Sequence, residues 1–175
     1  TPDTSDRTIT FSVDDGTASA VTSTKTVTVA DTNDAPTVSA SSGSTAFTES
    51  ASAAAAGDAV VVDDSVTVGD RDGDDLVGGT NSAVATVQIT GNLASGEDEL
   101  AFTNDGSTMG DLAASYNSSN GTLTFTSTNG ATAAQLEAAL QSVTYRNTSE
   151  TPDTSDRTIT FSVDDGTASA VTSTK

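Results

Sequence analysis

Cysteine, histidine and tryptophan are all absent from this chain of 175 residues. Without cysteine, no disulfide framework can stabilise the fold. Without histidine, neither a zinc site of the usual kind nor a proton shuttle near neutral pH is expected. Nucleophilic catalysis also lacks its usual parts, because no serine stands beside an evident base. Hard divalent cations, which bind oxygen atoms, remain as candidate metals.

Positive charge is scarce. Six lysine and arginine residues stand against 25 acidic ones, which gives a formal net charge of -19 at pH 7. Such a chain repels DNA, RNA and anionic lipid, and no basic stripe interrupts the pattern. No apolar run approaches the roughly 18 residues that a membrane span requires. We therefore expect no nucleic-acid partner and no direct membrane contact.

Large apolar residues are also few. Leu, Ile, Val and Phe number 31 of 175, under a fifth, and with the high charge this composition is typical of disordered chains. The order of the residues indicates otherwise, because stretches such as RTITFSV, ATVQIT and TLTFTS alternate apolar residues with Thr or Ser. This alternation is the pattern of half-buried β-strands. Something besides the core must stabilise such a fold.

One segment of 25 residues, TPDTSDRTITFSVDDGTASAVTSTK, occurs without a substitution at residues 1–25 and 151–175. The recurrence predicts a piece of a longer tandem array. We expect residues 1–34 to be the C-terminal hairpin and linker of a preceding repeat, since the turn-forming DTND and Pro36 stop the strand ladder. Residues 35–175 then form one β-sandwich repeat with a truncated final strand.

The first copy of the hairpin needs a partner, because a two-stranded hairpin alone is marginal in water. Loop closure favours the copy at residues 151–175 as the last hairpin of the repeat to which it is directly tethered. The copy at residues 1–25 can lean on the linker or on a neighbouring molecule, or can replace the other copy. Strand exchange between molecules through the duplicated hairpin is therefore a hypothesis.

The rest of the chain reads as short strands with Gly, Asn, Asp and Ser between them. One segment, TAAQLEAALQ, has helical spacing, with Leu136 and Leu140 on its apolar face and Thr132 as its N-cap. These elements predict an all-β fold, an antiparallel β-sandwich with one short helix, longer than a minimal immunoglobulin-like unit. Besides the two hairpins, strands are expected at residues 37–40, 46–48, 59–62, 65–68, 83–90, 99–103, 122–126 and 143–147.

The first candidate for a cation site is an acidic segment, DRDGDDLVGG, in a chain where Asp outnumbers Glu 20 to 5. It spaces Asp70, Asp72 and Asp74 two residues apart, so that carboxylates of a tight loop can converge on one hard cation. The segment lacks the Gly and Glu positions of an EF-hand. A solvated acidic turn is the alternative interpretation.

The second candidate is DTND, which offers oxygen atoms of Asp31, Asn33 and Asp34 between two domains. An ordinary polar linker is the alternative. The Asp-Asp-Gly turns are first of all turn signals, and their position at a domain tip makes ligation a second interpretation. The other acidic candidates for ligation are Glu49, Asp98, Asp164 and Asp165.

DTNDAPTVS resembles the DxND-x-P linker of cadherin-like repeats. AFTES, VTVGDRDGDD, VQITGNLASGEDELAF, ATAAQLEAALQSVTYRNTS and RTITFSVDDGTAS, in this order, resemble repeats of giant bacterial surface adhesins of the RTX type over the whole period. The resemblance implies an immunoglobulin/cadherin-like sandwich that serves as a calcium-stiffened extender. Many copies in a row would hold an adhesive tip away from the bacterial cell surface, with Ca²⁺ as cofactor and adjacent identical repeats as partners.

The resemblance also implies ligands. Cadherin-type linkers take ions from a Glu late in the first strand, an acidic loop and the linker itself. Here Glu49, then Asp70 and Asp72, then the DTND segment match those positions. The sequence has DRD where cadherins have DRE, and the following linker is not part of it. We therefore expect the site that includes Glu49 and Asp70 to be incomplete.

Two other classes of function remain as alternatives. A sugar-binding or ice-binding adhesin module could use TxT patterns such as residues 26–28 and 122–124, although exposed strand positions favour Thr in any case. With no Trp, two Tyr and five Phe, there is little for a sugar to stack on. A glycoside hydrolase needs a pair of carboxylates, and no pair stands out from the general acidity. We expect no enzyme.

Overall fold

The computed structural model describes residues 2–49, 59–73, 75–79 and 82–175. It divides the chain into two compact units, Thr1–Asn33 and Asp34–Lys175. The division lies within the DTND segment, where the turn-forming residues predict a boundary. Each unit is described by itself.

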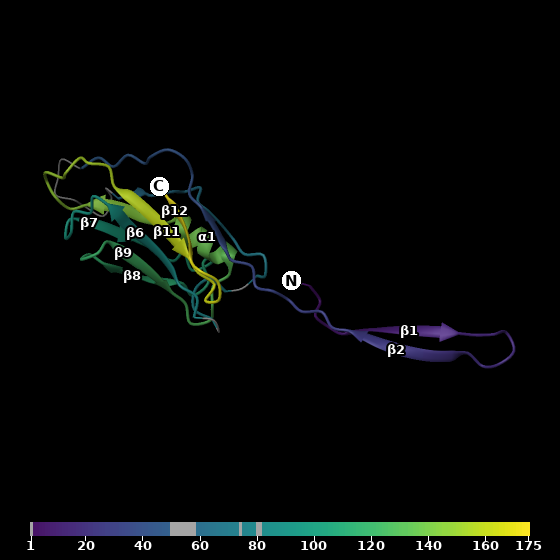
Figure 1. The fold of residues 1–175 in the computed structure, drawn as a ribbon. Coiled ribbons are helices and arrows are strands. Elements are labelled where there is room, and N and C mark those ends of the chain that lie inside the picture. Colours follow the sequence, from purple (N-terminus) through teal and green to yellow (C-terminus); the bar gives the residue numbers. More distant parts are fainter. Residues whose placement is uncertain (1, 50–58, 74, 80–81) are drawn as a thin grey trace. The chain divides into compact units, whose positions relative to one another are not determined.

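The first unit is a β-hairpin (Figure 1). Strand β1 (Arg7–Val13) pairs with β2 (Val21–Val27) in antiparallel register over seven residue pairs. The connecting turn is held by its own aspartate, because the Asp15 carboxylate accepts hydrogen bonds from the backbone N–H groups of Thr17 and Ala18. Such bonds make Asp a turn former independently of the surroundings.

The second unit consists of antiparallel sheets and, within the described residues, a single helix (Figure 1). A five-stranded sheet has the order β12-β11-β6-β9-β8, a three-stranded sheet has the order β4-β10-β7, and β3 pairs with β5. The strands are β3 (Thr37–Ser39), β4 (Val60–Val61), β5 (Thr67–Gly69), β6 (Ala85–Gly91), β7 (Asp98–Ala101), β8 (Ala113–Asn117), β9 (Thr122–Thr126), β10 (Thr144–Asn147), β11 (Thr158–Val163) and β12 (Val171–Thr174). The predicted all-β class is confirmed.

The core of the second unit is one apolar cluster, to which β6, β9 and β11 contribute most of their inward-facing residues. The inner face of the five-stranded sheet is apolar because alternate residues of β6, β9 and β11 are apolar, and these residues, among them Ala85 and Val163, are almost fully buried. The three-stranded sheet and the helix contribute Leu100, Val143, Leu136 and Leu140 to the same cluster. The few large apolar residues of the chain are thus concentrated in one place.

Helix α1 (Ala133–Gln141) forms where the spacing of apolar residues predicts it. Thr132 is its N-cap, and Thr132 and Gln135 form a reciprocal capping box that satisfies otherwise unpaired N–H groups at the helix start. Leu136, Ala139 and Leu140 are buried. The side chains of Glu137 and Gln141 bond to the backbone of Val68 and Val66, so the helix also anchors the segment around β5.

Two strand predictions differ from the structure. Residues 46–48 do not form a strand; Phe47 instead packs edge-on against Tyr145, with ring centroids 5.3 Å apart. Strand β8 is missing from the predictions, because its sequence AASYN contains no β-branched residue. It pairs only with β9, at the edge of the five-stranded sheet, where pairing demands little of the sequence. None of the helices in the described residues is long and apolar enough to cross a membrane.

We predict that Leu136→Ala lowers the free energy of unfolding by about 2–5 kcal/mol, because it leaves a cavity beneath the helix. Thr132→Ala, which removes the cap but no buried contact, should cost about 1 kcal/mol. Urea unfolding followed by circular dichroism measures both changes. Equal effects of the two substitutions would show that core burial does not hold the helix.

Candidate functional site

The pairing of β3 with β5 brings two acidic segments together at one end of the second unit. Thr37 lies opposite Gly69, so the residues just before β3 meet those just after β5. The backbone N–H of Asp34 donates a hydrogen bond of 2.5 Å to Oδ2 of Asp72. Arg71 Nη1 lies 3.9 Å from a carboxylate oxygen of Asp34, and both side chains are largely exposed.

The acidic loop after β5 has a defined backbone. Oδ1 of Asp70 accepts hydrogen bonds from the N–H groups of Asp72, at 2.9 Å, and Gly73, at 2.7 Å. Gly73 has φ +76°, a left-handed conformation that glycine adopts without strain. Asp74, the third predicted ligand of this loop, lies outside the described residues. Asp34, Asp70 and Asp72 are thus neighbours at one corner of the second unit. Their carboxylate oxygens are of the type that hard cations prefer.

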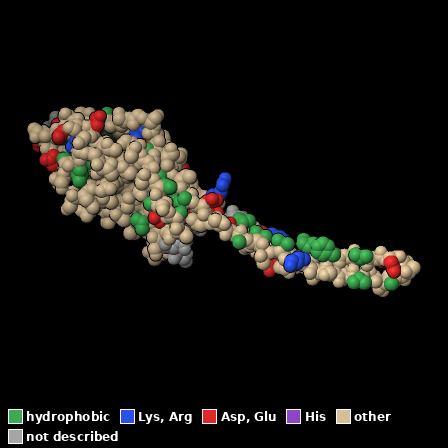
Figure 2. Space-filling model, in the orientation of Figure 1, with side chains coloured by type: hydrophobic (Ala, Val, Ile, Leu, Met, Phe, Trp, Pro, Cys, Tyr) green, Lys and Arg blue, Asp and Glu red, His purple; other side chains and the backbone are tan. Residues whose placement is uncertain are grey.

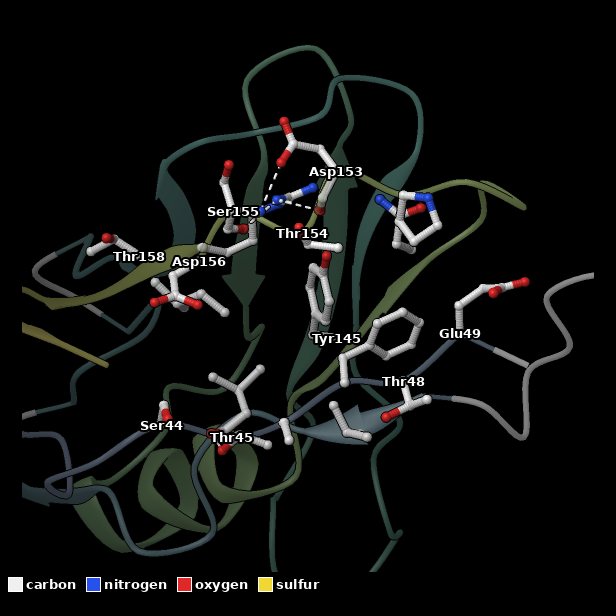
Figure 3. A pocket seen from close by; sticks show the side chains of 18 of the residues that line it. Ser44, Thr45, Thr48, Glu49, Tyr145, Asp153, Thr154, Ser155, Asp156 and Thr158 are labelled. Atoms are coloured by element: carbon white, nitrogen blue, oxygen red, sulfur yellow. Dashed lines mark hydrogen bonds between the residues drawn. The ribbon is translucent and has the colours of Figure 1, made fainter. Parts of the chain in front are cut away.

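The structure does not bring all the predicted ligands into this corner. Asp31 and Asn33 belong to the first unit, where the Asp31 carboxylate accepts a hydrogen bond from the N–H of Thr32. Glu49 lines a different pocket, together with Tyr145 and Asp153 (Figure 3). Across the part of the chain that the structure describes, no group of three or more acidic side chains is arranged to hold a metal ion.

The Asp-Asp-Gly turns use their carboxylates locally in both copies. In the turn after β11, Asp164 accepts a hydrogen bond from the N–H of Gly166, and the buried Asp165 accepts bonds from Thr167 and Ala168. The turn after β1 repeats these bonds through Asp14 and Asp15. The same turn thus forms whether or not its surroundings bury it.

Asp98, predicted as a ligand, is bound by protein donors instead. Its side chain is completely buried at the start of β7 and forms an ion pair with Arg157, with Nε 2.9 Å from Oδ2. The Tyr145 hydroxyl and the Asn147 amide each donate to Oδ1 at 2.7 Å, and the backbone N–H of Ala94 donates to Oδ2 at 2.7 Å. Four donors leave this carboxylate as the anion of a buried network rather than an open ligand.

The network changes the acidity of its members. Burial alone would raise the pKa of Asp98, but the hydrogen bonds from Arg157, Ala94, Tyr145 and Asn147 outweigh burial and hold the pKa below its ordinary value. Burial and the bond to Asp98 raise the pKa of Tyr145, and the bond to Asp98 raises the pKa of Arg157. Asp98 and Arg157 are therefore both charged at neutral pH.

A second buried carboxylate, Asp63, was not singled out from the sequence. It accepts hydrogen bonds from the N–H and the hydroxyl of Ser41, at 2.7 and 2.8 Å, and from the N–H of Ser65. Lys175 Nζ lies 3.8 Å from Oδ1, and the two side chains are 10% and 0% exposed. Burial would raise the pKa of Asp63, but the bonds from Ser41 and Ser65 and the charge of Lys175 lower it overall.

Asp98 and Asp63 each form an ion pair with a cation from the same hairpin, β11–β12 and its flanking residues. Arg157 precedes β11 and Lys175 follows β12. The sequence does contain a sign that the hairpin supplies these cations, because four of the six basic residues lie in the two copies of the repeated segment: Arg7, Lys25, Arg157 and Lys175. The hairpin is thus attached to the core by charge as well as by apolar contact.

The two copies of the hairpin have opposite exposure. In the second unit, Ile159, Phe161 and Val163 are 7%, 0% and 0% exposed, because β11 pairs with β6 and turns this face into the core. In the first unit the corresponding residues, Ile9, Phe11 and Val13, are 45%, 59% and 73% exposed.

We predict that Asp98→Asn lowers the free energy of unfolding by about 3–5 kcal/mol, because it leaves the Arg157 charge buried without a counter-charge. The matched control is Glu99→Gln, one residue away, which breaks the more exposed pair with Arg146 and should cost at most about 1 kcal/mol. Urea unfolding at pH 7 measures both. Similar losses for the two variants would contradict the special position of Asp98.

A second prediction concerns the stability of the folded chain at low pH. Because the pKa values of Asp98 and Asp63 are lower in the folded chain than in the unfolded chain, their stabilising contribution is present above about pH 4 and is lost as the pH falls further. The difference in stability between the wild type and Asp98→Asn should therefore shrink between pH 5 and pH 3 (about one unit either side of pH 4). A difference that stays constant over this range would exclude Asp98 as a titrating contributor.

Comparison with models of protein families, with curated proteins and with solved structures finds no match to this chain. Function is therefore inferred from the repeat, the fold and the side-chain chemistry.

Proposed function

We propose that the chain is a piece of a tandem array of β-sandwich modules, which acts as a calcium-stabilised extender of a bacterial surface adhesin. The observation that carries the proposal is the recurrence of one hairpin in two settings. One copy closes the five-stranded sheet of the second unit, and the other carries the same apolar face uncovered.

An immunoglobulin/cadherin-like sandwich is the arrangement that best accounts for the sheets. The five-stranded and three-stranded sheets contribute to one apolar cluster, as two packed layers do. The adjacent identical repeats are the partners that this function requires. A spacer needs no catalytic group, and its task is mechanical: each module must stay folded while the array holds a binding tip away from the cell surface.

Calcium fits the donors at the corner formed by Asp34, Asp70 and Asp72. All three offer carboxylate oxygens, which hard cations prefer. A bound cation would reduce the repulsion among acids in a chain of net charge -19 and would join the segment before β3 to the loop after β5. Asp31 and Asn33 of the DTND segment and Asp74 of the acidic segment stay candidate oxygen donors on the sequence alone. Extracellular modules bind calcium at about 10⁻⁴ to 10⁻³ M, which matches calcium outside cells.

We predict that calcium raises the melting temperature of the second unit. A free concentration ten times the dissociation constant adds about 1.4 kcal/mol per site, or roughly 3–6 °C for a domain of this size. Scanning calorimetry with about 10 mM calcium (about tenfold the weaker dissociation constants of extracellular modules) against EDTA, at matched ionic strength, measures the shift. The double variant Asp70→Asn/Asp72→Asn should lose the shift, and Asp64→Asn, an exposed acid elsewhere, should keep it.

The ionic-strength control separates two explanations of why the chain has so many acidic residues. If sodium chloride alone raises the melting temperature as much as calcium does, the acids form a salt-adapted surface and the calcium part of the proposal is wrong. If calcium acts equally on the double variant and on Asp64→Asn, the corner is not the binding site.

A further inference from the structure

The first hairpin has an apolar face that its own unit does not cover. Five of the seven large apolar side chains that are exposed among the described residues lie on β1 and β2 (Figure 2). The register places them on one face, because Val13 lies opposite Val21, and Val27 lies opposite Arg7, two residues before Ile9. The five are Ile9, Phe11, Val13, Val21 and Val27.

Hairpin β11–β12, which has the same sequence, shows the surface onto which such a hairpin docks: its edge pairs with β6 and its apolar face packs in the core. Strand β11 pairs with β6 over six residue pairs, in which Ile159 lies opposite Ile89 and Phe161 opposite Val87. Because residues 1–25 and 151–175 are identical, β1 carries every side chain that β11 uses in this pairing. The free edge and the apolar face of β1 are thus complementary to β6 of the second unit.

Charge complementarity points to the same surface. The second unit buries the carboxylates of Asp98 and Asp63 against Arg157 and Lys175 of its hairpin. The first hairpin carries Arg7 and Lys25 at the corresponding positions. Among the described residues of the first unit, Arg7 forms an ion pair with Asp3 alone, and that pair is largely exposed, so the Arg7 charge is available to a buried partner.

We propose that hairpin β1–β2 of one molecule docks onto the second unit of another copy, in the place that β11–β12 occupies. Arg7 and Lys25 of the donor then meet Asp98 and Asp63 of the acceptor, and Phe11 fills the space of Phe161. This inference does not depend on calcium, since it rests on the identical segments and the docking surface alone.

The two hairpins compete on nearly equal terms. Each exchange buries one apolar face and uncovers another, so the net change in buried area is small. The two hairpins differ in length, because β1 and β2 form seven residue pairs, whereas β11 and β12 form four and Ile159 and Lys175 exchange two further backbone hydrogen bonds. Val27, which is 48% exposed in the first unit, lies in this longer part. A small perturbation of β11 should therefore shift the competition towards exchange.

The duplicated segment allows the same substitution in either copy. In Phe161→Ser, the chain's own closing hairpin loses its central buried side chain while Phe11 of a neighbour is intact. We expect this variant to keep its β-sheet circular dichroism and to self-associate, with a weight-average mass that at least roughly doubles as concentration rises in sedimentation equilibrium, as for a swapped dimer or an open chain. The matched control, Phe11→Ser, should stay monomeric and melt as the wild type does.

Other outcomes overturn the proposal. A Phe161→Ser chain that stays monomeric at every concentration contradicts docking between molecules. If that monomer is folded, the hairpins exchange within one chain or not at all. If it is unfolded, hairpin β1–β2 cannot replace hairpin β11–β12. The double variant Phe11→Ser/Phe161→Ser should lose the association. If it associates as strongly as Phe161→Ser, the association is nonspecific aggregation and the proposal fails.

Cross-linking identifies the surface directly, since the chain has no cysteine of its own. Thr160 lies opposite Gln88 on β6, so the proposal places Thr10 of a neighbour opposite Gln88. In the Phe161→Ser background, Thr10→Cys/Gln88→Cys should form disulfide-linked dimers on a non-reducing gel. Thr24→Cys/Gln88→Cys, with one cysteine a strand further away, should not. Equal cross-linking by both pairs, or by neither, would exclude this docking geometry.

Discussion

The attachment of β11–β12 to β6 is the interaction on which the second unit depends. The chain has few large apolar residues, and β11 alone supplies Ile159, Phe161 and Val163 to the core. The same hairpin supplies the cations for two carboxylates that are fully buried. A buried charge without its partner is far more costly than one left in water. Apolar burial and charge neutralisation are therefore satisfied together or lost together.

The excess of aspartate over glutamate has a structural cause that applies before any cation is considered. Many aspartates accept hydrogen bonds from N–H groups two or three residues further along their own loops, as Asp105 does from Ser107 and Thr108, and Asp153 from Ser155. The shorter Asp side chain suits these turns, which Glu does not form as readily. In a protein with many connections between short strands, turn formation alone thus favours Asp, and only a subset of the acids is left for ligation.

Sequence patterns predicted those elements that form through interactions between residues close together in the sequence. The helix, its Thr132 cap and the alternating strands of the five-stranded sheet follow from spacing that a reader of the sequence can see. The partners of Asp98 do not, because Arg157 is 59 positions away and the pairing depends on the register between sheets. The same limit applies to β8, whose only strand partner among the described residues is β9. The sequence identified Asp34, Asp70 and Asp72 as candidate ligands, but it predicted neither the meeting of Asp34 with the loop of Asp70 and Asp72 nor the separation of Glu49 from that loop.

The order of the strands along the chain has a consequence for synthesis. Strand β6 lies near the middle of the five-stranded sheet, yet its neighbour β11 is made about seventy residues later. Contacts between residues so far apart in sequence form slowly. During synthesis, the edge of β6 that pairs with β11 must therefore stay unpaired until the last hairpin leaves the ribosome. In the tandem array proposed above, the hairpin of the preceding module would already be present at that moment, so correct folding would require that this earlier hairpin first dock onto its own module.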